Sequence, residues 1–303
     1  MQNSLSPGSV TKPSTTSAKD VLRASLRWII SHTQGRGRMW AVRKIGPWLE
    51  PINPLHQAWI GTIPFHFDFR SLYEQYMYYG CYETEVLGFC RRVVKPGDIV
   101  IDVGSNIGYM AAHFAMMAGT SGQVHAFEPV PFIFQRLTLL AEAAESVGYS
   151  LRANPCCLGD REGTVQILVP QENGNIGRNT IVSGFLLPGD IVETVTAPMI
   201  TLDSYFAQEQ LDPEKISLIK IDVEGAEPLV IQGMRNFLSG GTRPVIICEI
   251  NPQVMEKISI TPQTFFGEMD GFGYQLFLLT WKGFSPVDWR QVRKGGNVVW
   301  IPR

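Results

Sequence analysis

Cysteine patterns that hold metals or disulfides are missing from this sequence. The five cysteines form no CxxC pair and two of them are adjacent, so they predict neither a zinc site nor a disulfide framework. No hydrophobic run approaches the roughly 18 residues that would indicate a membrane-spanning helix, and the first 20 residues lack an apolar signal core. We therefore expect a protein of the reducing cytoplasm.

An excess of charge of one sign is also missing. Lys and Arg number 26 against 28 Asp and Glu, which gives a net charge of −2. Binding of nucleic acid through an overall basic field is therefore not expected. By contrast, a chain of 303 residues with 45% hydrophobic residues can bury a sizeable core. This length fits one large α/β domain with an appendage, or two smaller domains.

The chain divides into three unequal parts. Residues 1–20 are rich in Ser, Thr and Pro and have almost no large apolar side chains, so we expect a disordered tail. Residues 21–82 form an N-terminal cap that is basic and amphipathic at first and rich in aromatic residues from residue 40 onward. Residues 83–303 form the main domain.

The first half of the cap has two interpretations. Between Val21 and Leu49 it contains Arg and Lys but no acidic residue. Residues 21–44 could touch an anionic membrane surface, or their helix could pack on the main domain with a solvated polar face outward. The apolar residues that recur at helical spacing are Leu22, Leu26, Ile29 and Ile30.

From about residue 86 short apolar runs alternate with helical segments, which predicts a parallel sheet covered by helices on both faces. Helices should follow the first, second, fourth and fifth strands. Residues 163–200 interrupt this alternation with two β-like runs, Thr164–Val169 and Glu193–Ile200, around an Asn-rich loop. The expected strands are Ile99–Val103, Val124–Phe127, Leu151–Cys156, Leu218–Asp222, Val245–Glu249, Tyr274–Leu279 and Val298–Ile301.

The first of these strands leads into a glycine turn and a helix. Gly104 permits a tight turn with close backbone approach, and Gly108 permits close packing of the helix. Asn106 stands where a dinucleotide fingerprint needs a glycine. Asp102 places a carboxylate at the strand end, where it would repel a phosphate and attract an ammonium group. The turn therefore favours S-adenosylmethionine over a dinucleotide.

The second strand ends in an acid that suits either nucleoside. Glu128 lies 20 positions after Gly108, the spacing at which a carboxylate can accept hydrogen bonds from both ribose hydroxyls. Because Glu128 would serve both cofactors, Asp102 is the residue that discriminates between them.

Carboxylates also follow the fourth and fifth strands. Glu227 stands at a helix start, where an acid complements the helix dipole. Asp222 and Glu224 precede that helix on a turn freed by Gly225, so they can project into a cleft. Glu249 ends a strongly apolar strand, where an unpaired carboxylate would be costly. We expect a partner, a metal ion or a substrate hydroxyl near Glu249.

Together these pieces resemble the FkbM family of S-adenosylmethionine-dependent methyltransferases. They run in family order over about residues 80–301, and the most specific is the string from Lys220 to Glu227. Ser105 stands where alanine is more usual. The other matching pieces are Tyr82-Glu83, Lys95-Pro96-Gly97-Asp98, Ile101 to Gly108, Phe127-Glu128-Pro129, Leu158-Gly159-Asp160, Thr201-Leu202-Asp203 and Glu249.

The resemblance implies a Rossmann-like, seven-stranded class I methyltransferase sheet with helices on both faces. It implies methylation of a hydroxyl on a sugar, glycan, glycolipid or secondary metabolite, with small-molecule or glycan acceptors as partners. The predicted cofactor site comprises Asp102, Gly104, Ser105, Asn106, Gly108, Glu128, Pro129, Cys157 and Asp222. The predicted catalytic residues are Asp222, Glu224 and Glu249, and the predicted acceptor-binding residues are Glu83 and Asn179.

Three alternatives stay open. The grouped carboxylates could hold a magnesium ion that lowers the pKa of the acceptor hydroxyl, although no metal ligand is assigned. A nicotinamide-dependent oxidoreductase or epimerase acting on a nucleotide sugar shares the strand, turn and acid but needs the missing central glycine. A non-catalytic nucleotide-binding module would be favoured if the carboxylates formed buried pairs away from the cleft.

Overall fold

The computed structural model describes residues 17–33, 35, 37–170, 179–182, 191–250, 255–280, 282–292 and 296–303. Most of the predicted tail, residues 1–16, and the loop amides Asn173 and Asn175 lie outside the described residues. Residues 18–20 differ from the prediction, because they form the first turn of helix α1 (Ala18–His32). Ser17 and Asp20 close a capping box there, which starts the helix where a tail was expected.

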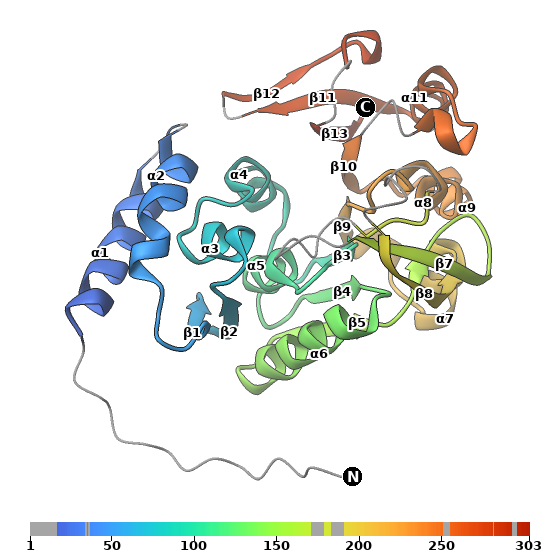
Figure 1. The fold of residues 1–303 in the computed structure, drawn as a ribbon. Coiled ribbons are helices and arrows are strands. Elements are labelled where there is room, and N and C mark those ends of the chain that lie inside the picture. The colour runs from blue at the N-terminus through green and yellow to red at the C-terminus, as the bar shows by residue number, and fades with distance from the viewer. Residues whose placement is uncertain are drawn as a thin grey trace, which may run out of the picture.

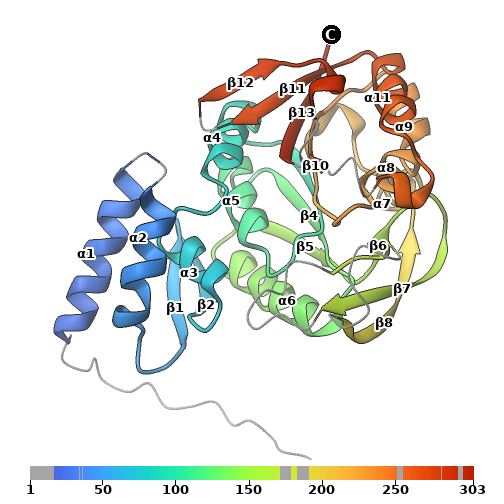
Figure 2. The ribbon, with the colours of Figure 1, turned by 45° about the horizontal axis from the view of Figure 1, so that its top comes forward.

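The cap packs to one side of the main domain, in blue in Figure 1 and Figure 2. The cap contains a β-hairpin formed by β1 (Leu55–Ile60) and β2 (Ile63–Asp68). This hairpin was not predicted, because its alternation of buried and exposed residues was hidden among prolines and aromatics. The second half of the hairpin and α3 share a core with the main domain through Phe65, Phe67 and Tyr109. The elements of the cap are α1, α2 (Gly37–Ile45), the short helix η1 (Gly46–Leu49), β1 (Leu55–Ile60), β2 (Ile63–Asp68) and α3 (Leu72–Tyr78).

The main sheet has eight strands in the order β12-β11-β13-β10-β9-β3-β4-β5. The five from β10 to β5 are parallel, and β13 is antiparallel to both of its neighbours. All seven predicted strands are present, but the count of seven is wrong because β12 pairs with β11 at the edge. The strands are β3 (Ile99–Val103), β4 (Gln123–Phe127), β5 (Ser150–Asn154), β9 (Ile216–Ile221), β10 (Val245–Ile250), β11 (Tyr274–Thr280), β12 (Gly283–Pro286) and β13 (Gly296–Pro302).

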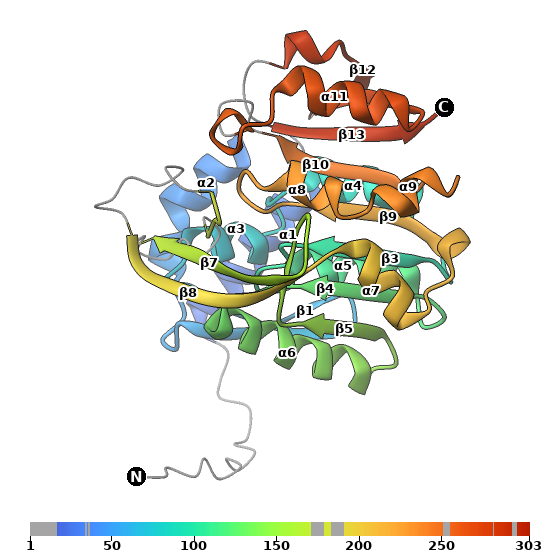
Figure 3. The same cartoon turned by 90° about the vertical axis from the view of Figure 1, so that its right-hand side faces the viewer.

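Helices cover both faces of this sheet, as predicted (Figure 3). One face packs against α4 (Thr84–Val93), α5 (Tyr109–Ala118) and α6 (Pro131–Ser146), and the cap extends this layer. The other face packs against α7 (Leu202–Glu209), α8 (Glu227–Gln232), α9 (Arg235–Ser239) and α11 (Pro262–Gly271). In the part of the chain that the structure describes, no helix is both long and apolar enough to cross a bilayer.

The two predicted β-like runs form a second, three-stranded sheet with the order β6-β8-β7. Its strands are β6 (Cys157–Leu158), β7 (Gly163–Pro170) and β8 (Ile191–Ile200). The predicted strand Leu151–Cys156 is too long, since β5 ends at Asn154 and Cys157 already belongs to β6. This small sheet brings Leu158 and Ile167 to the carboxyl edge of the main sheet, where they line a cleft.

Candidate active site

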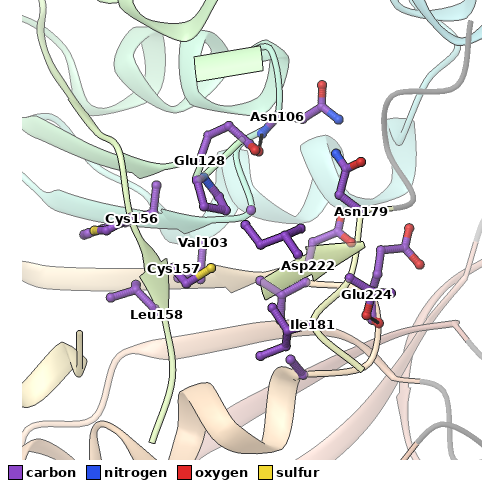
Figure 4. A pocket seen from close by; sticks show the side chains of 17 residues that line it. Val103, Asn106, Glu128, Cys156, Cys157, Leu158, Asn179, Ile181, Asp222 and Glu224 are labelled. Carbon is purple, nitrogen blue, oxygen red and sulfur yellow. Dashed lines mark hydrogen bonds between the residues drawn. The ribbon is translucent and has the colours of Figure 1, made fainter. Parts of the chain in front are cut away.

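Two neighbouring clefts open at the carboxyl ends of β3, β4 and β9. The first, with a volume of about 590 Å³, is lined mainly by apolar side chains and is called the apolar cleft (Figure 4). The second, with a volume of about 1210 Å³, is lined by six carboxyl groups and one lysine and is called the acidic cleft. The residues that line both clefts are Gly104, Asn106, Asp222 and Glu224.

Gly104 lets the turns after β3 and β9 approach closely. Its φ of +78° lies in the left-handed region, and a Cβ on it would lie 1.9 Å from the carbonyl oxygen of Asp222. Asp222 N–H in turn donates to Val103 O over 3.0 Å. Gly104 therefore lets the turn after β9 (residues 222–226, the acidic turn) lie against the turn after β3 (residues 104–108, the glycine turn). This contact places Asp222 between the two clefts.

Gly108 has a packing role in the structure. A Cβ on it would lie 2.3 Å from Leu140 Cδ2 and 2.7 Å from Leu137 Cδ1, both on α6. Gly108 therefore permits contact between the start of α5 and α6, rather than the helix-to-strand packing suggested by the fingerprint.

Glu128 lies at the tip of β4 and is 5% exposed. Its Oε2 accepts from Asn106 N–H over 3.1 Å, and its Oε1 accepts from Val130 N–H over 3.0 Å. Burial raises the pKa of Glu128 to about 7, although these backbone donors act in the opposite direction. Each oxygen keeps lone-pair capacity for a ribose hydroxyl.

The apolar cleft fits S-adenosylmethionine better than a dinucleotide. Phe127, Leu158 and Ile181 supply an apolar surface for an adenine ring, while Glu128 suits the ribose. Asp222 and Glu224 add two carboxylates, and no lysine or arginine is among the described residues that line this cleft. Such a lining repels a pyrophosphate and suits a ligand with an ammonium group and a cationic sulfur.

The strand alternation gathers the polar residues of the acidic cleft. Asp102 and Lys220 are direct partners across β3 and β9, and Lys220 is the partner of Ile247 across β10. Side chains two positions apart on a strand point to the same face. Glu249, two residues after Ile247, therefore shares the face of Lys220, toward α4 and Glu83.

Lys220 is the positive centre of this cleft. Its Nζ donates to Asp222 Oδ2 over 2.8 Å, and its side chain is 4% exposed. Burial alone would lower the pKa of Lys220, but the carboxylates of Asp222, Glu83 and Asp102 outweigh it and raise that pKa. Lys220 thus stays protonated and supplies one positive charge to the surrounding acids.

Three of those acids have raised pKa values. Burial raises the pKa of Asp102, whose two side-chain oxygens have no hydrogen-bond partner among the described residues. Burial also raises the pKa of Glu83 to about 7, with Lys220 opposing and Asp222 and Glu249 adding to the shift. Partial loss of solvent contact in the cleft and the Asp222 charge raise the pKa of Glu249, although its side chain is exposed.

Glu83, Asp222 and Glu249 are the candidate metal ligands of this cleft. One carboxylate oxygen from each lies within 4.8 Å of the others, close enough to share a cation. Lys220 Nζ already bonds to one of them, so the group has a built-in counter-ion that can replace a metal in balancing its charge.

Two side chains hold the backbone of the acidic turn through hydrogen bonds. Glu227 Oε1 accepts from the backbone N–H groups of Val223 and Gly225, each over 3.1 Å. Thr180 donates its hydroxyl to Glu224 O over 2.7 Å. Glu224 itself has a φ of +53°, an uncommon conformation for a residue with a side chain. The turn is therefore held in one shape, with Glu224 directed between the clefts.

The structure divides the predicted residues between the clefts. The apolar cleft receives Glu128, Pro129, Cys157 and Asn179, the last of which was assigned to the acceptor. The acidic cleft receives Glu83, Glu249, Ser105 and Asp102, the last two of which were assigned to the cofactor. Asp222, Glu224, Gly104 and Asn106 serve both, and Gly108 is not among the described residues that line either.

Three residues of the clefts had no role predicted from the sequence, namely Lys220, Thr180 and Tyr82. For Lys220 the sequence contained a usable signal. A lysine inside the predicted apolar strand Leu218–Asp222 is buried, and acids must lie near it to balance its charge. Thr180 and Tyr82 carried none, since their positions depend on how the second sheet and the cap fold over the main sheet.

Comparison with known proteins agrees with this geometry. Residues 102–276 match the methyltransferase FkbM domain, which is more than half of the chain. Over 175 residues the chain is 27% identical to the hexuronic acid methyltransferase AglP of Haloferax volcanii, covering 58% of this chain and 65% of that protein. Over 173 residues it is 28% identical to the 31-O-demethyl-FK506 methyltransferase FkbM of Streptomyces tacrolimicus, covering 47% of this chain and 62% of that protein.

The matches span less than two thirds of the length of both relatives. A crystal structure of methyltransferase FkbM from Methylobacillus flagellatus KT aligns with 94% of this chain and 60% of its own, at 13% identity and a TM-score of 0.39. The domain match extends from the glycine turn through the acidic turn and Glu249 to β11. On that match the chain belongs to the FkbM family of methyltransferases.

Proposed function

We propose that this protein is an S-adenosylmethionine-dependent O-methyltransferase that methylates a hydroxyl group of a sugar, glycan or secondary metabolite. The observation that carries the proposal is the junction of the two clefts. A ligand in the apolar cleft and a ligand in the acidic cleft can meet only beside the residues that line both, and two of these are the carboxylates Asp222 and Glu224.

The residues of the apolar cleft bind and orient the cofactor. Glu128 accepts hydrogen bonds from the ribose hydroxyls, and Gly104 leaves room for the ligand beside the backbone of the turn. When bound, S-adenosylmethionine would supply a methyl group on a cationic sulfur, so that an O–CH3 bond could form in line with the breaking C–S bond and S-adenosylhomocysteine would be the leaving group. Alignment of the two reactants can lower the barrier by up to about 7–11 kcal/mol, so positioning by these residues carries much of the rate.

The carboxylates at the junction hold the acceptor hydroxyl and take its proton. Lys220 fixes Asp222 through Oδ2, which leaves Oδ1 to accept the hydroxyl hydrogen. A placed base contributes roughly 10²–10⁴-fold to the rate. Glu224 supports Asp222 from the same turn, while Glu83 and Glu249 accept hydrogen bonds from neighbouring hydroxyls of the acceptor.

The charge of the acidic cleft selects among acceptors. One of its six carboxyl groups, Glu74, is already paired with Arg136 through two bonds of 2.7 Å. Lys220 is the one positively charged residue among the described lining residues, so the remaining acids exceed it in number. This lining favours a neutral polyhydroxyl acceptor and repels one that carries its own carboxylate, in contrast to the hexuronic acid named for AglP.

The test combines cofactor binding with methyl transfer. Calorimetric titration should show binding of S-adenosylhomocysteine and none of NAD. Mass spectrometry should then show a methyl group on an acceptor from a panel of hydroxylated sugars. Asp222→Asn should reduce turnover by about 10²–10⁴-fold, a larger factor than its effect on the affinity for S-adenosylhomocysteine, which it should also weaken because Asp222 lines the apolar cleft as well.

Glu142→Gln, at an exposed position on α6, is the matched control and should behave as wild type. Full turnover by Asp222→Asn would contradict the assignment of the base. Binding of NAD in place of S-adenosylhomocysteine would indicate the oxidoreductase alternative. Binding without transfer to any acceptor of the panel would indicate a non-catalytic module.

A further inference from the structure

The cap exposes most of the large apolar side chains found on the surface. Of the 16 large hydrophobic side chains that are exposed among the described residues, 12 lie between Val21 and Tyr73. Four are tryptophans, with exposed fractions of 63% at Trp28, 64% at Trp40, 78% at Trp48 and 56% at Trp59. Single exposed apolar residues are ordinary, but a concentration of this kind indicates an interaction surface.

Helix α1 turns its apolar face outward. Val21, Leu22, Trp28 and Ile29 are exposed, at spacings that place them along one side of the helix. The opposite side carries Arg23, which is 3% exposed and donates from Nε to Leu49 O over 2.7 Å. Leu26 and Ile30 pack inward on the core, so the helix is packed as in the second interpretation, but its outer side carries apolar residues in place of the expected polar face.

Arg27 also points toward the protein. Its guanidinium lies 4.6 Å from the ring centroid of Tyr78, and its Nη2 donates to Trp59 O over 3.1 Å. Arg23 thus attaches α1 to η1, and Arg27 attaches it to the hairpin and α3. With these polar groups used inside, the outer side of α1 has few groups that water can solvate.

The neighbouring α2 adds positive charge to the apolar surface. Met39 and Trp40 are exposed, and Arg43 and Lys44 follow each of them by one helical turn and are exposed as well. No acidic residue lies between Val21 and Leu49. Tryptophan prefers the interface between water and lipid, and Lys and Arg can lie along apolar surface while their charges reach headgroups.

We propose that α1, α2 and η1 form a docking face for a bilayer that contains anionic phospholipid. The face is defined by Val21, Leu22, Trp28, Ile29, Met39, Trp40, Arg43, Lys44 and Trp48. Inserted apolar side chains and basic residues act together in such binding, because each Lys or Arg near an anionic surface adds electrostatic attraction to the burial of apolar area.

Two other occupants of this face fit the observations less well. A second copy in a two-fold contact would bring two copies of Arg43 and Lys44 into one interface, and residues 21–49 offer no acidic residue to pair with them, which costs like-charge repulsion. Residues 1–16 consist largely of Ser, Thr and other small or polar residues, so they offer little apolar surface to cover four tryptophans. An anionic lipid surface satisfies both the tryptophans and the charge.

The position of the face bears on the acceptor. Helix α2 contacts α3, and Tyr73, Glu74 and Met77 of α3 line the acidic cleft. Docking would therefore bring the acidic cleft close to the bilayer. If the proposed methyl transfer is correct, its acceptor is a hydroxylated headgroup or glycan carried by a lipid. This last consequence rests on the proposed function, whereas the docking face does not.

The test is flotation of the full chain with phosphatidylcholine vesicles that contain or lack phosphatidylglycerol. The wild type should float with the anionic vesicles and less with the neutral ones, and added salt should weaken its binding. The double variant Trp28→Ser/Trp40→Ser should lose binding by at least about tenfold, as should Arg43→Glu/Lys44→Glu. Leu139→Ser, at a position 57% exposed on α6, is the control and should bind as wild type.

Three results would overturn the proposal. The first is a wild type that fails to float with anionic vesicles, and the second is an equal loss in the Leu139→Ser variant. The third is a dimer in solution that Trp28→Ser/Trp40→Ser dissociates, which would make a second copy the occupant. Binding of S-adenosylhomocysteine by every variant, measured in parallel, shows that each is folded and keeps a failed docking face distinct from a failed cofactor site.

Discussion

The apolar cleft and the acidic cleft meet at Asp222 but come from different parts of the chain. The apolar cleft is built mostly from short segments that directly follow strands, such as Val103–Asn106 and Phe127–Pro129. The acidic cleft adds residues 71–83 from the cap and the start of α4, together with Lys220 and Glu249. One site is thus encoded locally, whereas the other exists only after distant segments pack together.

The two clefts also differ in their electrostatics. The apolar cleft has three carboxylates without a basic residue among its described lining, which suits a cationic ligand. The acidic cleft holds Lys220 among its carboxyl groups, so its protonation states depend on one another. Affinity for S-adenosylhomocysteine should therefore report on the first cleft, and the pH dependence of turnover should report on the second.

The largest effect should come from Gly104→Ala, which attacks the point where the clefts join. The added Cβ would lie 1.9 Å from the Asp222 carbonyl oxygen at a φ of +78°, so either the two turns separate or the backbone changes conformation. We expect loss of S-adenosylhomocysteine binding beyond about 100-fold and loss of turnover, measured by calorimetry and methyl transfer.

Gly88→Ala is the matched control for this glycine. Gly88 lies within α4, and a Cβ on it would meet no atom within 4 Å. Alanine in a helix interior stabilises by roughly 0.5–1 kcal/mol relative to glycine. This variant should therefore bind S-adenosylhomocysteine normally and unfold at a slightly higher denaturant concentration than the wild type. Normal binding by Gly104→Ala would show that the two turns do not depend on their close contact.

The residues predicted for the cofactor site come from segments in which strand, turn and acid follow one another along the chain. Gly104, Asn106 and Glu128 all line the apolar cleft, and their binding of the cofactor stays a prediction. The FkbM resemblance, resting above all on the string from Lys220 to Glu227, gave the correct family. The alternation of apolar runs gave the seven strands other than β12. It overlooked β12, since Gly283–Pro286 is short and ends in a proline, a weak strand signal.

The residues of the acidic cleft were harder to group from the sequence. Glu83 was identified through the matching piece Tyr82-Glu83, but its electrostatic interaction with Lys220 depends on how α4 packs against β9. Asp102 was assigned to the ammonium group of the cofactor, since the sequence could not show that Lys220 lies opposite it on the neighbouring strand. In the cap, the outward apolar face of α1 was not foreseen, because periodicity identifies the apolar positions but not the side on which arginine contacts lie.

An intermediate effect is expected from Lys220→Met, which removes the positive charge of the acidic cleft. Removing one partner of a buried ion pair destabilises a protein by about 3–5 kcal/mol, because the remaining charge is left uncompensated. The pKa values of Glu83 and Asp102 should rise, since Lys220 lowers both in the wild type. Chemical denaturation should show reduced stability above pH 7 and less loss below it, where the acids are protonated.

Lys215→Met is the control for Lys220→Met, because Lys215 is exposed in the short helix Pro213–Lys215. It should leave stability and the pH profile unchanged. If Lys220→Met were as stable as the wild type at every pH, the acids of the cleft would not be ionised together, and Lys220 would not be the residue that balances them.

The smallest effect should come from Glu83→Gln, which tests the acidic cleft alone. Burial raises the pKa of Glu83 to about 7, so the ionised fraction grows from about a tenth at pH 6 to about nine tenths at pH 8. As an ionised acceptor for a substrate hydroxyl, Glu83 should make turnover rise several-fold over this range, and the variant should lose that rise. The raised pKa also means that Glu83 lowers the stability of the wild type as pH rises from 4.5 to about 7, and Glu83→Gln should lose less stability over this range, with the part due to Glu128 remaining. Glu85→Gln on the same helix should keep the wild-type profile. A rise that persists in Glu83→Gln would assign it to Glu249, whose pKa is raised in the same cleft.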